Sequence, residues 1–79
     1  QIHHGSGIGK FTTLAPSSVI LGNVSIGKYS YIGANSTIKQ NIKIGDNCII
    51  GAGSVVIRNV KNNEVVAGSP AKLLRKNKK

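Results

Sequence analysis

Residues 26–51, IGKYSY IGANST IKQNIK IGDNCI IG, place an isoleucine at the start of each group of six residues. The same phase extends along the chain in both directions. An aliphatic residue occupies every sixth position, in the series Ile2, Ile8, Leu14, Ile20, Ile26, Ile32, Ile38, Ile44, Ile50 and Val56. This period matches neither an amphipathic helix nor an alternating hairpin. It predicts a chain that turns a corner every six residues and directs one aliphatic side chain inward from each short strand.

A second series of small or β-branched residues lies two positions before each aliphatic residue. It consists of Ser6, Thr12, Ser18, Val24, Ser30, Ser36, Ile42, Cys48, Ser54 and Val60. Because alternate residues of a strand share a face, these side chains should also point inward. Glycine or alanine often follows the aliphatic residue, where the backbone approaches a corner and a large side chain would obstruct it. We expect Cys48 to be a buried structural thiol and not a nucleophile.

A period of eighteen residues is superimposed on the period of six. Asn23, Asn41 and Asn59 recur at this spacing, each followed by valine or isoleucine. Three strands therefore form one coil, and the asparagines stack at one of its three corners. Asparagine tolerates left-handed backbone angles, and stacked amides can hydrogen-bond to one another. The predicted fold class is all-β, a parallel β-helix of hexapeptide repeats with three strands per coil.

The repeats end near Lys61, which divides the chain into a β-helix, residues 1–61, and a C-terminal extension, residues 62–79. The extension should contain a turn at residues 62–64 and a last strand at residues 65–66. Ser69 is a suitable N-cap and Pro70 suits a first helical turn, so we expect a short basic helix over residues 71–76. The chain also opens inside a repeat with an unpaired edge, from which we expect earlier coils or a domain before Gln1.

Basic residues outnumber acidic ones by 11 to 2, which gives a net charge of +9. Such a balance suits an anionic ligand or an acidic surface. We expect no nucleic-acid partner, because the few aromatic residues, Phe11, Tyr29 and Tyr31, occupy repeat positions that favour packing over base stacking. No segment resembles a secretory signal or a membrane span, which predicts a cytoplasmic protein. A stack this short should also need lateral partners, so oligomerisation is expected.

The hexapeptide series and two local motifs resemble a known superfamily. The motifs are residues 50–56, IGAGSVV, and residues 67–72, AGSPAK. They are similar to the acyltransferases of the left-handed parallel β-helix superfamily, and the resemblance covers essentially the whole chain. Residues 2–11, IHHGSGIGKF, and the absence of loop insertions look most similar to the sugar acyltransferases that O-acetylate sialic acid or N-acetylate UDP-linked amino sugars in the bacillosamine pathway. The resemblance implies a left-handed coil, a homotrimer with clefts between subunits, and a nucleotide-sugar-binding βαβ domain before the β-helix.

The resemblance also implies that His4 is the catalytic base. Transfer of an acetyl group from acetyl-CoA to the amine or hydroxyl of a sugar or nucleotide sugar needs a base for the attacking proton. Imidazole, with an unperturbed pKa of about 6.5, is suited to this role. His3 is expected to pack or to support His4, because adjacent strand residues point in different directions. The family has an acidic residue where this chain has Gly5, so another group must orient His4; a surface histidine without a catalytic role is the alternative.

The acetyl-CoA site is likewise implied by the resemblance. Its predicted residues are Thr13, Gly22, Ala34, Ala52, Pro70, Ala71 and Lys72. The Gly22 amide would donate to the thioester oxyanion and count as a second catalytic group. The amides of Ala34 and Ala52 would hold the pantetheine arm, and Lys72 would meet the adenine and phosphate end. No metal is expected, because adjacent histidines with no third one cannot form the zinc site of β-helical carbonic anhydrases.

Two other functions remain open at this point. A non-catalytic β-helix that trimerises or binds a partner is favoured by Gly5, which removes the family's acidic residue. A serine or maltose-type O-acetyltransferase is the second alternative, although those relatives usually carry loop insertions that this chain lacks. The sequence decides neither the acceptor nor whether nitrogen or oxygen is acetylated.

Overall fold

The computed structural model describes residues 5–77, which form a stack of short strands measuring 31 × 25 × 21 Å. Two-residue strands follow one another at intervals of six residues: β1 (Gly7–Ile8), β2 (Thr13–Leu14), β3 (Val19–Ile20), β4 (Ser25–Ile26), β5 (Tyr31–Ile32), β6 (Thr37–Ile38), β7 (Lys43–Ile44), β8 (Ile49–Ile50) and β9 (Val55–Val56). Two longer strands follow, β10 (Glu64–Gly68) and β11 (Ala71–Lys76). Each short strand ends on the aliphatic residue of its hexapeptide, as the period of six predicts.

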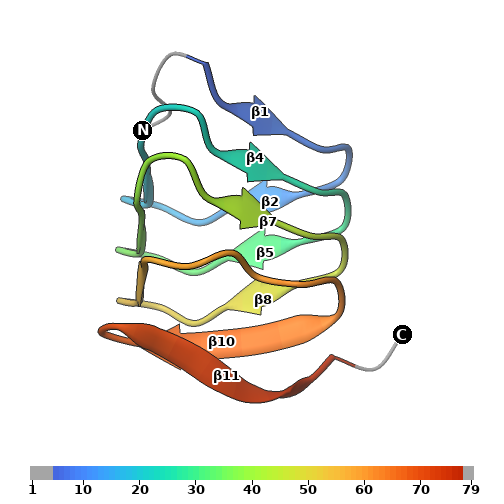
Figure 1. Cartoon of the computed structure of the whole chain (residues 1–79), viewed down its shortest axis with the longest axis vertical. Helices are drawn as coiled ribbons and strands as arrows, with labels where there is room; N and C mark the ends of the chain where they lie inside the picture. The colour runs from blue at the N-terminus through green and yellow to red at the C-terminus, as the bar shows by residue number, and fades with distance from the viewer. Residues whose placement is uncertain (1–4, 78–79) are drawn as a thin grey trace.

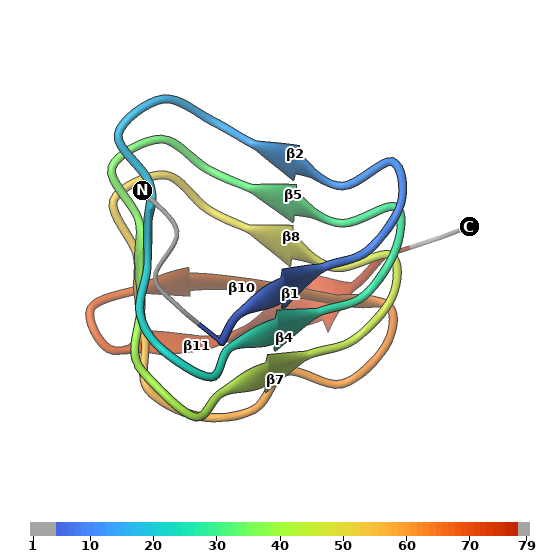
Figure 2. The ribbon, with the colours of Figure 1, turned by 90° about the horizontal axis from the view of Figure 1, so that it is seen from above.

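Successive strands belong to different sheets, as expected for a coil with three sides (Figure 1). The sheets have the orders β1-β4-β7, β3-β6-β9 and β2-β5-β8-β10-β11. Pairing among β1 to β9 is parallel and joins residues eighteen apart, such as Ile8 with Ile26 and Ile26 with Ile44. Seen from the N-terminal end in Figure 2, the chain runs anticlockwise as it recedes from the viewer. The fold is therefore the predicted left-handed parallel β-helix of hexapeptide repeats.

The interior of this prism is filled by the two inward series. From Ile20 to Val56, the aliphatic residue of every hexapeptide exposes at most 3% of its surface. Ile8 and Leu14, in the first described coil, are partly buried against the same cluster. Cys48 is a free cysteine with no exposed surface, which confirms the expectation of a buried thiol.

Buried serines of the second series connect successive coils. The Ser30 hydroxyl donates to the Gly45 carbonyl at 2.9 Å and accepts the Cys48 N–H at 3.0 Å. The Ser36 hydroxyl donates to the Gly51 carbonyl at 2.8 Å. Among the described residues, every buried side-chain nitrogen or oxygen has a hydrogen-bond partner. Since an unpaired buried polar group is costly, these serines hold the coils in one register.

The turns between strands stack into three columns, which we name corners A, B and C. Corner A comprises residues 22–23, 40–41 and 58–59, corner B residues 16–17, 34–35 and 52–53, and corner C residues 10–11, 28–29 and 46–47. The second residue of these turns commonly has a left-handed backbone, with φ of 58° at Asn23 and 64° at Asn41. These two residues confirm the predicted asparagine stack at one corner. Asn59 has another role, because its side-chain oxygen accepts the Lys43 N–H at 2.8 Å.

At Gly33, next to a corner, two successive coils approach each other closely. A Cβ at Gly33 would lie 2.6 Å from the Ala52 backbone nitrogen and 2.7 Å from the Ile50 carbonyl oxygen, so the coils would have to separate. We expect Gly33→Ala to lower the free energy of unfolding by about 1–3 kcal/mol. At Gly7 an added Cβ would meet no atom within 4 Å. The matched variant Gly7→Ala should change the free energy by less than about 0.5 kcal/mol in urea unfolding, and equal losses would contradict the argument.

The predicted C-terminal helix is wrong. Residues 71–76 form β11, which pairs antiparallel with β10 from Glu64 with Lys76 to Gly68 with Ala71. The predicted last strand at residues 65–66 is part of β10, which pairs with β8. A six-residue helix has little stability of its own, whereas β10 offers an open edge that the returning chain can satisfy with hydrogen bonds. No membrane-crossing helix occurs in the part of the chain that the structure describes.

Candidate functional site

The predicted base, His4, and its neighbour His3 lie outside the residues that the structure describes. Gly5, the next residue, has a left-handed backbone with φ of 86°. A Cβ at Gly5 would lie 3.0 Å from the side-chain oxygen of Asn23, in the coil below. Any side chain at this position would meet the Asn23 amide closely, and the left-handed backbone favours glycine.

An open groove of about 510 Å³ lies at corner A. It is lined by Leu21, Gly22, Asn23, Gln40 and Asn41. Asn23, Gln40 and Asn41 are exposed, and their amides can both donate and accept hydrogen bonds. The groove therefore offers an uncharged, hydrogen-bonding lining beside Gly22, the predicted oxyanion donor.

Corners A and B also carry backbone N–H groups that the sheets do not use. The Gly22 carbonyl accepts the Asn41 N–H at 3.0 Å, and the Ala34 carbonyl accepts the Gly53 N–H at 2.8 Å. Within residues 5–77, the N–H groups of Gly22, Ala34 and Ala52 have no acceptor. These are the three amides that the resemblance assigns to the thioester and the pantetheine arm. Gly22 and Ala34 are half-buried and Ala52 is exposed, so each N–H is accessible to a ligand that carries an acceptor.

Corner C differs, because side chains from the next coil satisfy the corresponding N–H groups. The Lys28 N–H donates to the Asp46 carboxylate at 2.9 Å, and the Asp46 N–H donates to the Asn62 side-chain oxygen at 2.8 Å. At Lys28 and Asp46 the turn N–H groups of corner C are therefore not available to a ligand, unlike those of Gly22, Ala34 and Ala52.

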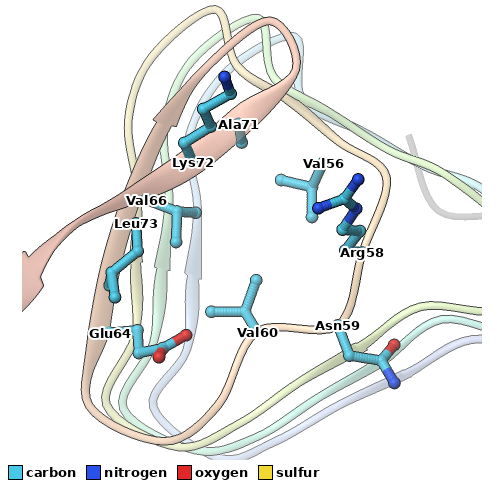
Figure 3. Close-up of a pocket in the computed structure, with 9 residues that line it drawn as sticks. All are labelled: Val56, Arg58, Asn59, Val60, Glu64, Val66, Ala71, Lys72 and Leu73. Atoms are coloured by element: carbon cyan, nitrogen blue, oxygen red, sulfur yellow. The ribbon is translucent and has the colours of Figure 1, made fainter.

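A cavity of about 250 Å³ lies at the C-terminal end of the prism, and Figure 3 shows the residues around it. Its lining consists of Val56, Arg58, Asn59, Val60, Glu64, Val66, Ala71, Lys72 and Leu73. Two predicted cofactor residues, Ala71 and Lys72, are among them, whereas Pro70 lies exposed in the preceding hairpin turn. Arg58, to which sequence analysis gave no role, also lines the cavity. In the structure it adds a second cation to the cavity that Lys72 lines.

The groove and the cavity follow one another along corner A. Gly22 and Gln40 line the groove, and Arg58, one coil below Gln40, lines the cavity. Adjacent parallel strands are about 4.8 Å apart, so Gly22 and Arg58 are separated by about 10 Å along the stack. The arrangement suits an elongated ligand that has a hydrogen-bond acceptor at one end, a polar middle part and an anionic group at the other end.

The structure does not bring all the predicted site residues together in one chain. Ala34 and Ala52 belong to corner B, which strands β3, β6 and β9 separate from Gly22 at corner A. Thr13 is exposed on β2, which is not part of the sheet β3-β6-β9 that connects corners A and B. The predicted residues therefore form two sets, Gly22 with Lys72 along corner A, and Ala34 with Ala52 along corner B.

The aromatic residues, whose repeat positions were expected to favour packing, lie outside the core. Phe11, Tyr29 and Tyr31 have 75%, 52% and 45% of their surfaces exposed. Phe11 and Tyr29 are the second residues of turns at corner C, a position whose side chain is outside the prism. The spacing of three residues after an aliphatic residue could have indicated this exposure.

The sequence matches two family models. Residues 5–40 match the bacterial transferase hexapeptide (six repeats), and residues 23–58 match the hexapeptide repeat of succinyl-transferase. The two matches overlap and together follow the repeats of the β-helix. No protein of curated function matches the sequence.

Solved structures of acetyltransferases and of LpxA share the fold. A variant of perosamine N-acetyltransferase from Caulobacter crescentus with a histidine replaced by asparagine, in complex with CoA and GDP-perosamine, is 30% identical over 91% of this chain, with a TM-score of 0.89. The acetyltransferase domain of PglB from Neisseria gonorrhoeae, also solved with acetyl coenzyme A, is 34% identical over 81%, with a TM-score of 0.80. LpxA from Acinetobacter baumannii is 29% identical over 92%, with a TM-score of 0.91.

This chain spans only 34%, 31% and 28% of the lengths of those three structures. Within that span the agreement covers the strands and corners described above. The uninterrupted hexapeptide repeats, the left-handed three-sided coil and the transferases that share them establish that the chain belongs to the hexapeptide-repeat acyltransferase superfamily.

Proposed function

We propose that this chain is the catalytic β-helix of an acetyl-CoA-dependent sugar acetyltransferase, whose acceptor is the amine or hydroxyl of a sugar or nucleotide sugar. The observation that carries this proposal is the order of groups along corner A. The Gly22 N–H, which has no acceptor within residues 5–77, comes first, the uncharged groove follows, and the cations of Arg58 and Lys72 come last. Support comes from the perosamine N-acetyltransferase and PglB structures, whose bound molecules are CoA with GDP-perosamine and acetyl coenzyme A.

Acetyl-CoA would lie along corner A with its thioester at the Gly22 end and its phosphates at the Arg58 end. Its thioester oxygen accepts the Gly22 N–H, and its amide-containing arm lies in the groove beside Gln40. Its phosphates lie toward Arg58 and Lys72, where charge-assisted hydrogen bonds favour an anion. An N–H donor aimed at a developing oxyanion is typically worth about 10²–10³ in rate, so Gly22 is the second catalytic group of the proposal.

The chemistry needs no covalent enzyme intermediate. His4 accepts a proton from the acceptor amine or hydroxyl as its nitrogen or oxygen attacks the thioester carbonyl. The new carbon–nitrogen or carbon–oxygen bond forms, the negative charge on the carbonyl oxygen is held by Gly22, and the carbon–sulfur bond then breaks. The departing thiolate takes a proton, directly or from the imidazolium of His4, and leaves as free CoA.

A homotrimer would complete the site by bringing corner B of one copy to corner A of the next. The outer face of sheet β3-β6-β9 connects these two corners and consists of Val19, Thr37 and Val55, all half-buried even in the single chain. The outer face of β1-β4-β7 includes Lys43, and that of β2-β5-β8 includes Tyr31. We infer that this face packs against the neighbouring copies, with Lys39, which directly follows β6, at its edge, because its strand positions are uncharged and charged residues are depleted from the centres of interfaces.

A single charge on that face tests the trimer. We expect Thr37→Lys to convert a species of three times 8.3 kDa into monomers, because three lysines would be buried without partners. Ser25→Lys places the same charge at the equivalent strand position of the next face and should leave the trimer intact. Light scattering coupled to size exclusion measures both masses. A trimer in both variants, or a wild-type monomer, would reject this face as the interface.

Binding of acetyl-CoA separates the enzyme from a non-catalytic β-helix. Calorimetric titration of the chain should give saturable binding of acetyl-CoA with one site per subunit. The double variant Arg58→Gln/Lys72→Gln should bind more weakly, since it removes the cations proposed for the phosphates. Absence of saturable binding by the folded wild-type chain would favour a trimerising or partner-binding scaffold.

A further inference from the structure

Corner C carries an exposed aromatic pair that the proposed acetyl transfer does not use. The rings of Phe11 and Tyr29 are stacked, with centroids 5.2 Å apart and an interplanar angle of 14°. They come from adjacent coils, and both side chains are largely exposed. The pair therefore forms a flat aromatic surface outside the hydrophobic core.

The backbone beneath these rings is in an unfavourable conformation. Phe11 and Tyr29 have φ of 60° and 59°. The same position in the following turns is occupied by Asn47 and Asn63, with φ of 57° and 62°. Asparagine visits this region far more readily than a bulky residue. Because the rings are exposed, their burial in the core does not offset the conformational free energy that an aromatic residue costs at this backbone geometry. Backbone strain of this kind commonly marks a binding site.

Positive charge flanks the aromatic pair. Lys10 and Lys28 directly precede the two aromatic residues, and both are exposed. Residues 1–40 contain no aspartate or glutamate. The nearest acid in the column is Asp46, one coil below, whose carboxylate accepts the Lys28 N–H. The corner thus combines aromatic faces with two ammonium groups, a combination suited to a base attached to phosphates.

A smooth strand face connects this corner to the proposed acetyl-transfer site. Sheet β1-β4-β7, at the front of Figure 1, runs from corner A to corner C. Its outward residues in the two upper coils are Gly7 and Ser25, which are small and exposed. Gly22 and Tyr29 therefore lie at the two ends of one side of the same coil, with no large side chain on the strand between them.

We propose that this face binds the nucleoside diphosphate part of a nucleotide-linked sugar. The nucleobase stacks on the rings of Phe11 and Tyr29, the diphosphate lies against Lys10 and Lys28, and the sugar crosses β4 toward Gly22. This inference rests on the proposed sugar acetyltransferase function, because it assigns the acceptor class of that site. It assigns a part of acceptor recognition to the β-helix itself.

The test uses the 79-residue chain with UDP and GDP as probes. In calorimetric titrations, the wild-type chain should bind at least one of them saturably. The double variant Phe11→Asn/Tyr29→Asn keeps a residue that tolerates the left-handed backbone, as Asn47 does. It should bind the nucleotide at least about tenfold more weakly, the size of effect expected for loss of base stacking. Tyr31→Thr, which copies Thr13 of the coil above, removes an aromatic side chain elsewhere and should change the affinity less than about twofold.

Turnover separates this inference from the function on which it rests. With a nucleotide-linked amino sugar, the double variant should show a KM for the sugar raised at least about tenfold, with the KM for acetyl-CoA unchanged. With the free amino sugar, wild type and variant should be equal. Thiol release by the wild type without any UDP or GDP binding would overturn the inference and leave the acetyltransferase standing. No thiol release with any sugar would reject the acetyltransferase itself.

Three further results would also overturn the proposal. Inorganic diphosphate binding as tightly as UDP would mean that the lysines act without the aromatic pair. A change of oligomeric state in the double variant would identify corner C as a subunit interface. Tighter binding of a single-stranded oligonucleotide than of either nucleoside diphosphate would identify a nucleic-acid surface.

Discussion

Replacement of His4 by alanine should lower the rate of acetyl transfer by about 10²–10⁴, the usual contribution of a positioned general base. Without the imidazole, the attacking amine or hydroxyl must lose its proton to water. Binding of acetyl-CoA should be unaffected, because its proposed contacts are with Gly22, Arg58 and Lys72. Release of free thiol from acetyl-CoA, followed with a saturating amino sugar, measures the rate.

The adjacent histidine provides the matched control for this variant. His3→Ala should lose much less activity than His4→Ala, because successive residues of an extended chain point in different directions. An unaltered rate in His4→Ala would reject its role as the base. A larger loss in His3→Ala than in His4→Ala would transfer that role to His3.

The second large effect concerns stability. Ile32→Ala should lower the free energy of unfolding by about 2–5 kcal/mol, because it removes a buried side chain and leaves a cavity that the rigid stack cannot close. Ile32 has no exposed surface and lies in β5, between β2 and β8 in the five-stranded sheet. The loss should appear as a lower midpoint in urea unfolding with an unchanged slope.

Ile57 supplies the same substitution outside the prism. It is 41% exposed and lies out of phase with the inward series. Ile57→Ala should change the free energy of unfolding by no more than about 0.5 kcal/mol, as expected of a surface position. Similar losses for Ile32→Ala and Ile57→Ala would mean that the six-residue phase does not define the interior.

The β-helix could be predicted from the sequence because each turn repeats the same physical requirements. A position in phase with Ile32 must be aliphatic to fill the interior, and the residue two places before it must be small. The position of Gly33 must avoid the backbone of the next coil. These requirements are local and periodic, so they are visible in one sequence, and the structure confirms them from Ile20 to Val56.

The C-terminal segment could not be predicted in the same way. Ser69 and Pro70 are good helix-start residues, but the free edge of β10 decided the outcome, and that edge exists only once the coils have stacked. Local propensity was overridden by pairing with β10, whose own position depends on β8, earlier in the chain. The helix prediction failed for this reason.

The candidate site was accessible from the sequence only in part. The resemblance identified Gly22, Ala34 and Ala52, and their N–H groups lack acceptors within residues 5–77. It gave no role to Arg58, because its position beside the cavity depends on where the final hairpin lies. The exposure of Phe11 was not predicted either, since sequence analysis took its repeat position only as favouring packing over base stacking.

The most direct test of the central claim is mass spectrometry of the acceptor after incubation with the chain and isotopically labelled acetyl-CoA. The account predicts that the labelled acetyl group appears on an amino sugar or its nucleotide-linked form, one for each CoA released, and that His4→Ala nearly abolishes the product. Intact acetyl-CoA and unmodified sugars, in the presence of a folded wild-type chain, would contradict it.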